Sequence, residues 1–458
     1  MEISKPVATC VRAAPNEQVA DTKQETRGLV RTRDIDPDSV KVVRKLLAAD
    51  HEAYLVGGCV RDLYLRRKPK DFDVATSATP EQIRRLFRNS RVIGRRFRLV
   101  HVYFGPKVIE TSTFRSAPRS DDDDLLIRHD NEWGSVEDDA RRRDFTVNGL
   151  FYDIETGRIV DFVDGLHDLD AGVIRTIGDA ETRFREDPVR MIRAIKFAAR
   201  LDFQIEPECW AALLNCAGDI SKCSRARVLE ELYKLMRGGA SRRSFELLHV
   251  SGLLAHIWPP FVELLDDPTP APSRLGDAPP HHPAMRLLRH LEALDDYVLE
   301  TRQDIGNGVL AAVLFAPFLA DEELQGARQE LDRQVDDLMA KPSVYLGVAR
   351  RDRELARQII MAHRRMALPS RGGRRRSSLV QRQYFHDALI FLGISVEARG
   401  GDGSELRQWQ ALAEMSREGP VEPSESRSRR KRSRRRRRTP EDGRAPTHRG
   451  RRRPEAGQ

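Results

Sequence analysis

Two aspartates separated by one phenylalanine are the residues that point most directly to a chemistry. Asp71 and Asp73 flank Phe72, and the two-residue period of a strand would present both carboxylates on one face. Two carboxylates this close repel each other unless one is protonated or a cation lies between them. Mg²⁺ favours such oxygen ligands and often brings substrate phosphates with it. The pair therefore predicts a magnesium site that acts on a phosphate-bearing substrate.

A glycine pair lies shortly before these aspartates. Gly57 and Gly58 follow a short apolar run, and Arg61 comes about one helical turn later. Because glycine has no side chain, backbone N–H groups at this position can approach an anion closely. The segment from Tyr54 to Val74 therefore offers both a phosphate-binding loop and a metal site.

Glu110 is a candidate third carboxylate. The alternating segments 99–104 and 108–113 surround Gly105-Pro106 and predict a hairpin, with Glu110 on its second strand. Its side chain either joins the two aspartates at the metal or is a surface glutamate on an edge strand. The sequence leaves both interpretations open.

A run of three arginines precedes Asp144. The guanidinium groups suit triphosphate oxygens, and Asp144 is placed to hold a ribose hydroxyl or to assist at the metal. The alternative is a solvated surface of salt bridges, which is the common role of such a run.

Four polar residues recur every three positions further along the chain, namely Asp187, Arg190, Arg193 and Lys196. Residues three apart are neighbours on a helix, so they predict one polar stripe. An aspartate acceptor beside an arginine donor matches the hydrogen-bonding edge of a nucleobase, and the later cations suit phosphates. The alternative is an ordinary helix start, with Asp187 as N-cap and Arg190 in a surface ion pair.

The elements that must position these residues change in type near residue 170. Strands are expected at 53–56, 72–75, 99–104, 108–113, 150–154 and 159–162, with helices at 39–49 and 59–65. A further helix is expected from Thr79, where Thr79 and Gln82 would form a capping box. Helical periodicity then dominates, over 188–201, 207–217, 225–237, 242–254, 284–302, 307–318, 321–340 and 343–366. The fold class expected is α+β, with a small mixed sheet and helices in a head that precedes an all-helical body.

This reading divides the chain into six segments. They are a disordered leader (1–35), a head (36–170), a helical neck (171–258), a Pro-rich connector (259–283), a helical body (284–415) and a disordered Arg-rich tail (416–458). An acidic run at 121–124 is expected to be a solvated loop.

Composition excludes several classes of protein. No apolar run approaches the roughly 18 residues that span a membrane, and the N-terminus lacks an apolar signal core. The five cysteines form no CxxC pair, which argues against a disulfide framework or a zinc ribbon. We therefore expect a soluble, cytoplasmic protein with no membrane partner.

The positive charge is concentrated at the C-terminus. The last 32 residues, 427–458, hold 14 arginines and one lysine against three acidic residues, a net charge of +12. Since the whole chain carries +9, the remainder carries −3. Such a tail predicts sequence-independent affinity for RNA phosphates, although it can also be a merely solubilising segment.

Taken in order, these clusters resemble the class II tRNA nucleotidyltransferase/poly(A) polymerase family, which has the polymerase-β-like nucleotidyltransferase fold. The matching text is LVGGCVRD, DFDVAT, IETSTFR, RRRDFTVNGL, DFVDGLHDL and REDPVRMIRAIKFAARL, which is dense from about Asp50 to Leu201. The segment Val92 to Val102 is similar to the signature of the bacterial poly(A) polymerase branch.

The resemblance implies that the head (36–170) is catalytic, that the neck (171–258) reads the base and that the body (284–415) binds RNA. It also implies a role for each candidate residue. Asp71 and Asp73 would bind two catalytic Mg²⁺ ions, with Asp144 also catalytic. The nucleotide would be bound by Gly58, Arg61, Arg143, Asp187, Arg190, Arg193 and Lys196. The family more often has arginine at the position of Lys196.

The implied reaction is template-independent addition of AMP from ATP to RNA 3′ ends, with release of pyrophosphate. The implied partners are RNA 3′ ends, ATP and the RNA-degradation machinery, since such tails promote RNA turnover. The first alternative is a CCA-adding tRNA nucleotidyltransferase. The second, of a different class, is an inactive RNA-binding relative that acts through its basic tail.

Overall fold

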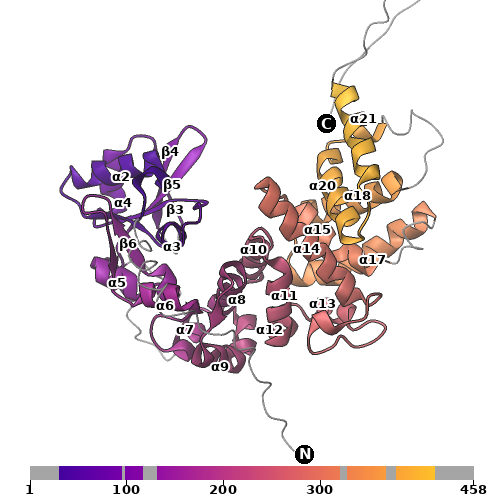
Figure 1. Ribbon diagram of the computed structural model, residues 1–458, viewed down its shortest axis with the longest axis horizontal. Helices are drawn as coiled ribbons and strands as arrows, with labels where there is room; N and C mark the ends of the chain where they lie inside the picture. Colours follow the sequence, from indigo (N-terminus) through magenta and orange to yellow (C-terminus); the bar gives the residue numbers. More distant parts are fainter. Residues whose placement is uncertain (1–29, 95–97, 117–131, 320–326, 368–377, 418–458) are drawn as a thin grey trace, which may run out of the picture.

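A computed structural model describes residues 30–94, 98–116, 132–319, 327–367 and 378–417. Figure 1 shows an open arc, with a sheet-containing head at one end and helices along the rest. This arrangement confirms the predicted α+β fold class. The acidic run at 121–124, the predicted tail from 418 onward and part of the 92–102 signature lie outside the described residues.

The head is built on a mixed sheet with the order β3-β4-β5-β2-β1-β6-β7. Only β2 and β5 run parallel, and every other pair of neighbours is antiparallel. The strands are β1 (Ala53–Val56), β2 (Asp73–Thr76), β3 (Ser90–Ile93), β4 (Leu99–Phe104), β5 (Lys107–Thr113), β6 (Leu150–Asp153) and β7 (Arg158–Asp161). Strand β3 was not predicted from the sequence.

The two faces of the sheet pack differently. Helix α2 (Pro37–Leu47) packs on β1, β2 and β5, and α4 (Pro80–Leu86) packs on β3 and β4. Thr79 and Gln82 form the capping box expected at the start of α4. On the other face, a second apolar cluster forms around Phe114 and Phe151, and α5 (Val136–Arg141) adds Ala140 to it.

Two short segments next to the sheet carry or flank candidate site residues. Helix α3 (Gly58–Tyr64) follows β1 directly and packs on β1 and β6. The 3-10 turn η3 (Thr146–Asn148) leads into β6 and packs on α6 (Gly165–Ala171). A two-stranded parallel pair, β8 (Val173–Ile174) with β9 (Gln204–Ile205), then begins the helical part of the chain.

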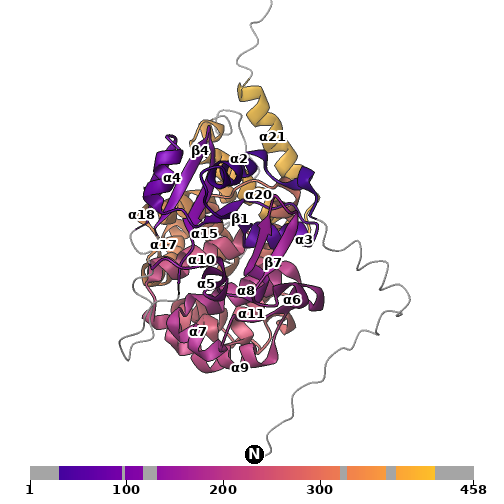
Figure 2. The same ribbon diagram turned by 90° about the vertical axis from the view of Figure 1, so that its left-hand side faces the viewer.

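Beyond the head, helix packs on helix, and α8 lies against α7, α10 and α11. Figure 2 shows α7 and α9 below the strands of the head. The helices are α7 (Ala180–Glu186), α8 (Val189–Leu201), α9 (Pro207–Cys216), α10 (Arg225–Met236), α11 (Ser241–Val250), α12 (Leu253–Ile257), α13 (Pro259–Leu265), α14 (Pro283–Thr301), α15 (Asn307–Phe315), α17 (Arg328–Leu346), α18 (Arg350–Ala367), α20 (Phe385–Ala398) and α21 (Ser404–Arg417). The 3-10 turns among them are η4 (Ala217–Lys222), η5 (Leu275–Asp277) and η6 (Ala316–Phe318).

Several predicted boundaries differ from the structure. The leader was predicted to extend to residue 35, but Val30 and Ile35 are buried in the core and anchor the start of the head. The connector predicted at 259–283 contains α13, whose Phe261 stacks on Trp258 at 4.3 Å between ring centroids. Proline at a first helical turn favours such a helix, so proline content alone misidentified a linker.

The later helices also differ from the prediction. Helix α17 continues through Pro342 to Leu346, although the sequence predicted a break between 340 and 343. Helices α20 and α21 were not predicted, and α21 extends to Arg417, just inside the predicted tail. In the described residues, no helix is both long and apolar enough to cross a bilayer.

Candidate active site

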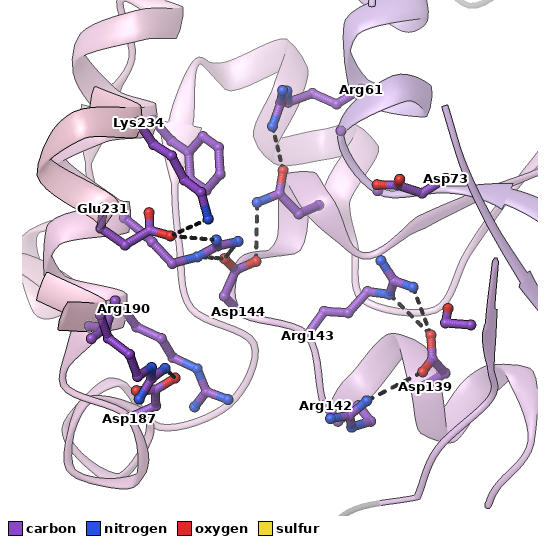
Figure 3. Close-up of a pocket in the computed structure, with 18 of the residues that line it drawn as sticks. Arg61, Asp73, Asp139, Arg142, Arg143, Asp144, Asp187, Arg190, Glu231 and Lys234 are labelled. Atoms are coloured by element: carbon purple, nitrogen blue, oxygen red, sulfur yellow. Dashed lines mark hydrogen bonds and ion pairs between the residues drawn. The ribbon is translucent and has the colours of Figure 1, made fainter. Parts of the chain in front are cut away.

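A cleft of about 740 Å³ lies between the head and helices α8 and α10. Figure 3 shows Asp73 on the head side and Asp187, Arg190 and Glu231 on the helical side. Most predicted residues line this cleft, namely Gly58, Arg61, Asp73, Arg143, Asp144, Asp187, Arg190 and Arg193. The cleft is also lined by Arg142 of the arginine run and by residues that were not predicted, namely Arg115, Asp139, Asn148, Arg200, Arg227, Glu231 and Lys234.

Asp73 and Asp71 occupy different environments. Strand β2 begins at Asp73, so Asp71 lies two residues before the strand. Asp71 is exposed, whereas Asp73 is half-buried and lines the cleft. The charge of Asp71 nevertheless reaches Asp73, because it contributes to the raised pKa of that carboxyl.

Glu110 lies beside Asp73. Strand β5 lies between β4 and β2, and Glu110 pairs in register with Asp73 across the parallel ladder. The interpretation of Glu110 as a residue on an edge strand is therefore wrong. Its carboxylate lies 3.4 Å from Nε2 of His101 on β4.

The electrostatics of Asp73 favour a bound cation. Burial and the negative charges of Glu110 and Asp71 raise the pKa of Asp73 to about 6, although Arg143 partly offsets them. Among the described residues, no group of three or more His, Cys, Asp or Glu side chains encloses a metal position. Mg²⁺ is typically held by one or two carboxylates together with substrate phosphates, so these oxygens fit that ion without a complete protein cage.

The first glycine of the pair adopts a backbone conformation that requires glycine. Gly57 has φ +71° and ψ −130°, and a Cβ there would lie 3.1 Å from Nη1 of Arg143. Only glycine adopts this backbone without strain. Gly57 donates its N–H to the Leu150 carbonyl at 3.0 Å, which fixes the loop against β6. Gly58 then begins α3 at the wall of the cleft.

Arg61 is held in place from three sides. It is 2% exposed, and its guanidinium donates to Asp62 at 2.7 Å and to Asn148 at 2.5 Å. The same group lies over the Phe197 ring, 5.1 Å from its centroid. Asp62 also accepts from Arg200 at 3.1 Å, so one buried carboxylate orients two cations at the cleft.

One aspartate organises the arginines that precede Asp144. Asp139 on α5 accepts from Arg143 at 2.8 Å and lies 3.6 Å from Arg142. Burial and the surrounding arginines, beginning with Arg115, lower the pKa of Arg142 to about 9. The predicted solvated surface is therefore wrong for Arg142 and Arg143, which are partly buried. The spacing of Asp139 from both arginines, three and four residues, was the signal that could have identified it.

Asp144 connects the head to α8. Its carboxylate lies 2.5 Å from Nη2 of Arg193 and accepts from Nδ2 of Asn148 at 3.1 Å. Burial alone would raise the pKa of Asp144, but the Arg193 guanidinium and the Asn148 hydrogen bond hold it well below its usual range. Asp144 is thus a permanent anion that fixes the position of Arg193.

Asp187 does not cap α8, because that helix begins after Pro188 without a side-chain cap. Its Oδ2 accepts from Arg227 on α10 at 2.9 Å, whereas its Oδ1 is buried and has no hydrogen-bond partner within the described part of the chain. Arg190 is only 8% exposed, so the surface-pair interpretation is wrong. Its Nη1 donates to Glu186 at 2.9 Å and to the Arg183 carbonyl at 3.0 Å.

Glu231 on α10 gathers three cations. It accepts from Lys196 at 2.7 Å and from Lys234 at 3.2 Å, and lies 3.9 Å from Arg193. Burial and the Arg193 charge lower the pKa of Lys196 to about 8, although Glu231 opposes this. Lys196 does not itself line the cleft but is connected to it through Glu231. No local spacing indicated Glu231, since it follows Lys196 by 35 residues.

Three family descriptions match successive parts of the chain. Residues 53–175 match the poly A polymerase head domain. Residues 202–265 match the probable RNA and SrmB-binding site of polymerase A, and residues 326–442 match the polymerase A arginine-rich C-terminus.

Similar proteins include two enzyme types. Poly(A) polymerase I of Escherichia coli O6:H1 is 35% identical over 432 residues, which cover 90% of either chain. The CCA-adding enzyme of Bacillus subtilis is 37% identical over 213 residues, 46% of this chain and 52% of its own. Among solved structures, the Bacillus stearothermophilus CCA-adding enzyme in complex with CTP has a TM-score of 0.55 at 24% identity and covers 84% of this chain and 82% of its own. That last match shows a shared fold.

Proposed function

The chain belongs to the bacterial poly(A) polymerase I branch of the class II tRNA nucleotidyltransferase/poly(A) polymerase family, and it is therefore a nucleotidyltransferase. From this assignment we propose which reaction its cleft catalyses and how. The reaction is the addition of AMP from ATP to RNA 3′ ends with release of pyrophosphate. The observation that carries this proposal is the match to a poly(A) polymerase I over 90% of either chain. The CCA-adding relative from Bacillus subtilis matches about half.

Asp187 and Arg190 read the base in this proposal. The buried Oδ1 of Asp187, which no described residue contacts by a hydrogen bond, accepts from an exocyclic amino group, while Arg227 holds the other oxygen. Arg190 donates to the neighbouring ring nitrogen. Adenine and cytosine each present an amino donor beside a ring acceptor, whereas guanine and uracil present a carbonyl. The pair therefore excludes GTP and UTP and leaves the choice of ATP over CTP to the shape of the cleft.

The nucleotide phosphates lie toward the head. Gly58, Arg61 and Arg143 contact triphosphate oxygens, and Arg193 adds a cation from the helical side. Because Asp139, Asp144 and Asn148 already hold these arginines, little rotamer entropy is lost when the nucleotide binds. Catalysis arises mainly from this fixed positioning and charge, as is general for transfer of phosphate-linked groups.

Asp71 and Asp73 hold the divalent metal ions, with Glu110 as an additional oxygen ligand. Two Mg²⁺ ions, when bound, supply charge that acidifies the RNA 3′-hydroxyl and stabilises the leaving pyrophosphate. The raised pKa of Asp73 is consistent with a carboxylate cluster arranged for a cation rather than for stability. The arginines of the cleft would orient the α-phosphate so that the 3′-hydroxyl attacks from the side opposite the leaving pyrophosphate.

Lys196 gives ATP binding a pH dependence. Its pKa of about 8 means that its charge is present at pH 7 and is lost as the pH rises through 8. We expect ATP affinity, measured by equilibrium binding without RNA, to fall by up to about tenfold between pH 7 and pH 9. The matched control is Lys196→Arg, which stays protonated and should bind ATP equally at both values. An equal loss of affinity in both proteins would exclude Lys196 as the titrating group.

The tail contributes affinity for RNA. Deleting residues 427–458 removes a net charge of +12, so RNA affinity should weaken and depend less steeply on salt. The measurement is the slope of log K against log salt for an unstructured RNA, with ATP binding as the control that should stay constant. If the truncated and full chains give the same slope, the tail does not contact RNA.

The wider setting is part of the same proposal. Non-templated A tails mark RNA 3′ ends, and we propose that this enzyme acts in the cytoplasm and that its products pass to RNA-degrading enzymes. A pull-down with the full chain from a cytoplasmic extract treated with nuclease tests this partner. Recovery of an exonuclease or helicase supports a direct contact, and recovery only without nuclease indicates attachment through RNA.

Nucleotide preference tests the reaction directly. An unstructured RNA oligonucleotide is incubated with the full chain, Mg²⁺ and each of the four nucleoside triphosphates alone. We expect long extension with ATP, little with CTP, and none with GTP or UTP. No extension under any condition would instead support the non-catalytic, RNA-binding alternative.

A further inference from the structure

A second cavity lies in the helical body and shares no residue with the catalytic cleft. It has a volume of about 270 Å³ and lies between α14, α18, α20 and the turn η6. Figure 1 shows these helices at the opposite end of the arc from the head. Among the described residues no carboxylate lines it, but three arginines and three histidines do, namely Arg286, Arg289, Arg399, His281, His290 and His363.

Arg286 gives the clearest indication of a ligand. Its Nε is buried and has no hydrogen-bond partner among the described residues. A buried donor on a charged group that lacks a partner is costly and rare in native structures. An anion in the cavity would supply the missing acceptor. Arg289 and Arg399 lie at the same cavity and add positive charge.

The inner wall of the cavity is neutral and aromatic. Nη2 of Arg399 donates to Nε2 of His363 at 3.2 Å, and because arginine can only donate, this histidine nitrogen accepts. Burial and the charges of Arg399 and His290 lower the pKa of His363 to about 3, so its ring is uncharged. The ring meets Phe391 edge-on, with centroids 5.4 Å apart. The cavity thus combines a cationic lining with flat, uncharged rings.

We propose that this cavity binds the phosphate of a nucleotide unit and that the RNA strand supplies it, at a point upstream of the 3′ end in the cleft. Guanidinium groups bind phosphate oxygens through paired N–H donors, and an RNA strand presents such oxygens at every nucleotide. The assignment of RNA as the source rests on the proposed function. A free phosphate has the same chemistry, so the experiment separates the two sources.

The test compares two double variants of the full chain. Arg286→Gln/Arg399→Gln removes two cationic groups of the cavity. The matched control, Arg350→Gln/Arg351→Gln, removes two exposed arginines at the start of α18 that do not line it. Thermal unfolding and ATP binding show that both variants are folded with an intact cleft. Affinity is then measured for oligoadenylates of increasing length, without ATP, so that failure of catalysis does not affect the result.

We expect the cavity variant to lose about tenfold or more in affinity for long oligoadenylates and nothing for the shortest. Its slope of log K against log salt should fall by about 0.7 for each RNA phosphate that the variant no longer neutralises. The control variant should match the unmodified chain. Equal losses in both variants would mean that general surface charge, not this cavity, binds RNA, and would overturn the proposal.

A second measurement tests free phosphate as the source. Inorganic phosphate at constant ionic strength should raise the unfolding temperature of the unmodified chain more than that of the cavity variant, because only the former keeps the site. Loss of this phosphate effect with unchanged RNA affinity assigns the cavity to a free phosphate and overturns the RNA source. If the cavity variant retains both the RNA affinity and the phosphate effect, the cavity is not a phosphate site.

Discussion

Replacing Asp73 by asparagine is expected to abolish extension of RNA while leaving RNA binding nearly intact. The change removes one negative charge from the carboxylates that hold the metal ions and leaves the side-chain shape unchanged. Metal ions in such sites supply several kcal/mol of transition-state stabilisation, which corresponds to a loss on the order of 10³-fold or more in rate. The measurement is single-turnover extension of an RNA primer with ATP.

The unfolding temperature of the Asp73→Asn variant distinguishes the loss of a metal ligand from the loss of the fold. Because the folded protein raises the pKa of Asp73 to about 6, the ionised carboxylate is unfavourable there near pH 7. The neutral amide removes that cost, so the unfolding temperature should be equal or higher. Asp50→Asn is the matched control, since Asp50 is exposed and does not line the cleft. Substantial residual extension by the Asp73 variant would contradict the assignment of the metal site.

Replacing Asp187 by asparagine should remove the selection among bases. Arg227 can only donate, so it will keep the oxygen of the new amide and turn the NH₂ toward the base. That donor then faces the amino group of adenine, which loses its acceptor. Sites built to hydrogen-bond a substrate group discriminate strongly when the match is lost, so kcat/KM for ATP should fall on the order of 100-fold or more.

The same substitution should change the preference among the four nucleoside triphosphates in a specific way. Guanine and uracil offer a carbonyl at the matching position, so GTP and UTP should gain relative to ATP, whereas CTP should not. Kinetics of extension with each nucleotide measure this pattern. Arg227→Lys, which keeps a donor for Oδ2, should retain most of the original preference. A uniform loss for all four nucleotides would show that Asp187 supports the fold of the cleft rather than reading the base.

Local signals were sufficient to predict most of the head. The capping box at Thr79, the helix that follows the glycine pair and the alternating hairpin all depend on signals within a few residues, and the structure contains each of them. The short strand β3 was missed because its four residues show no clear burial alternation. Strand β2 begins at Asp73, one residue later than predicted, because periodicity does not fix where a strand starts.

The partners that lie far apart in the sequence could not be predicted in the same way. Glu231 reaches Lys196 across 35 residues, and Arg227 reaches Asp187 across 40. Such pairs depend on how α10 packs against α8, which no local pattern reports. The sequence therefore predicts which residues carry charge at the cleft, whereas the fold determines which of those charges are already paired before a nucleotide arrives.

The central claim is that the cleft adds A tails to RNA in general rather than finishing one tRNA end. The most direct measurement supplies ATP and CTP together to a tRNA that lacks its CCA end and, in parallel, to an unstructured RNA. We predict long A tails on both substrates, with little effect of CTP. A single completed CCA end on the tRNA, with no extension of the unstructured RNA, would contradict the account.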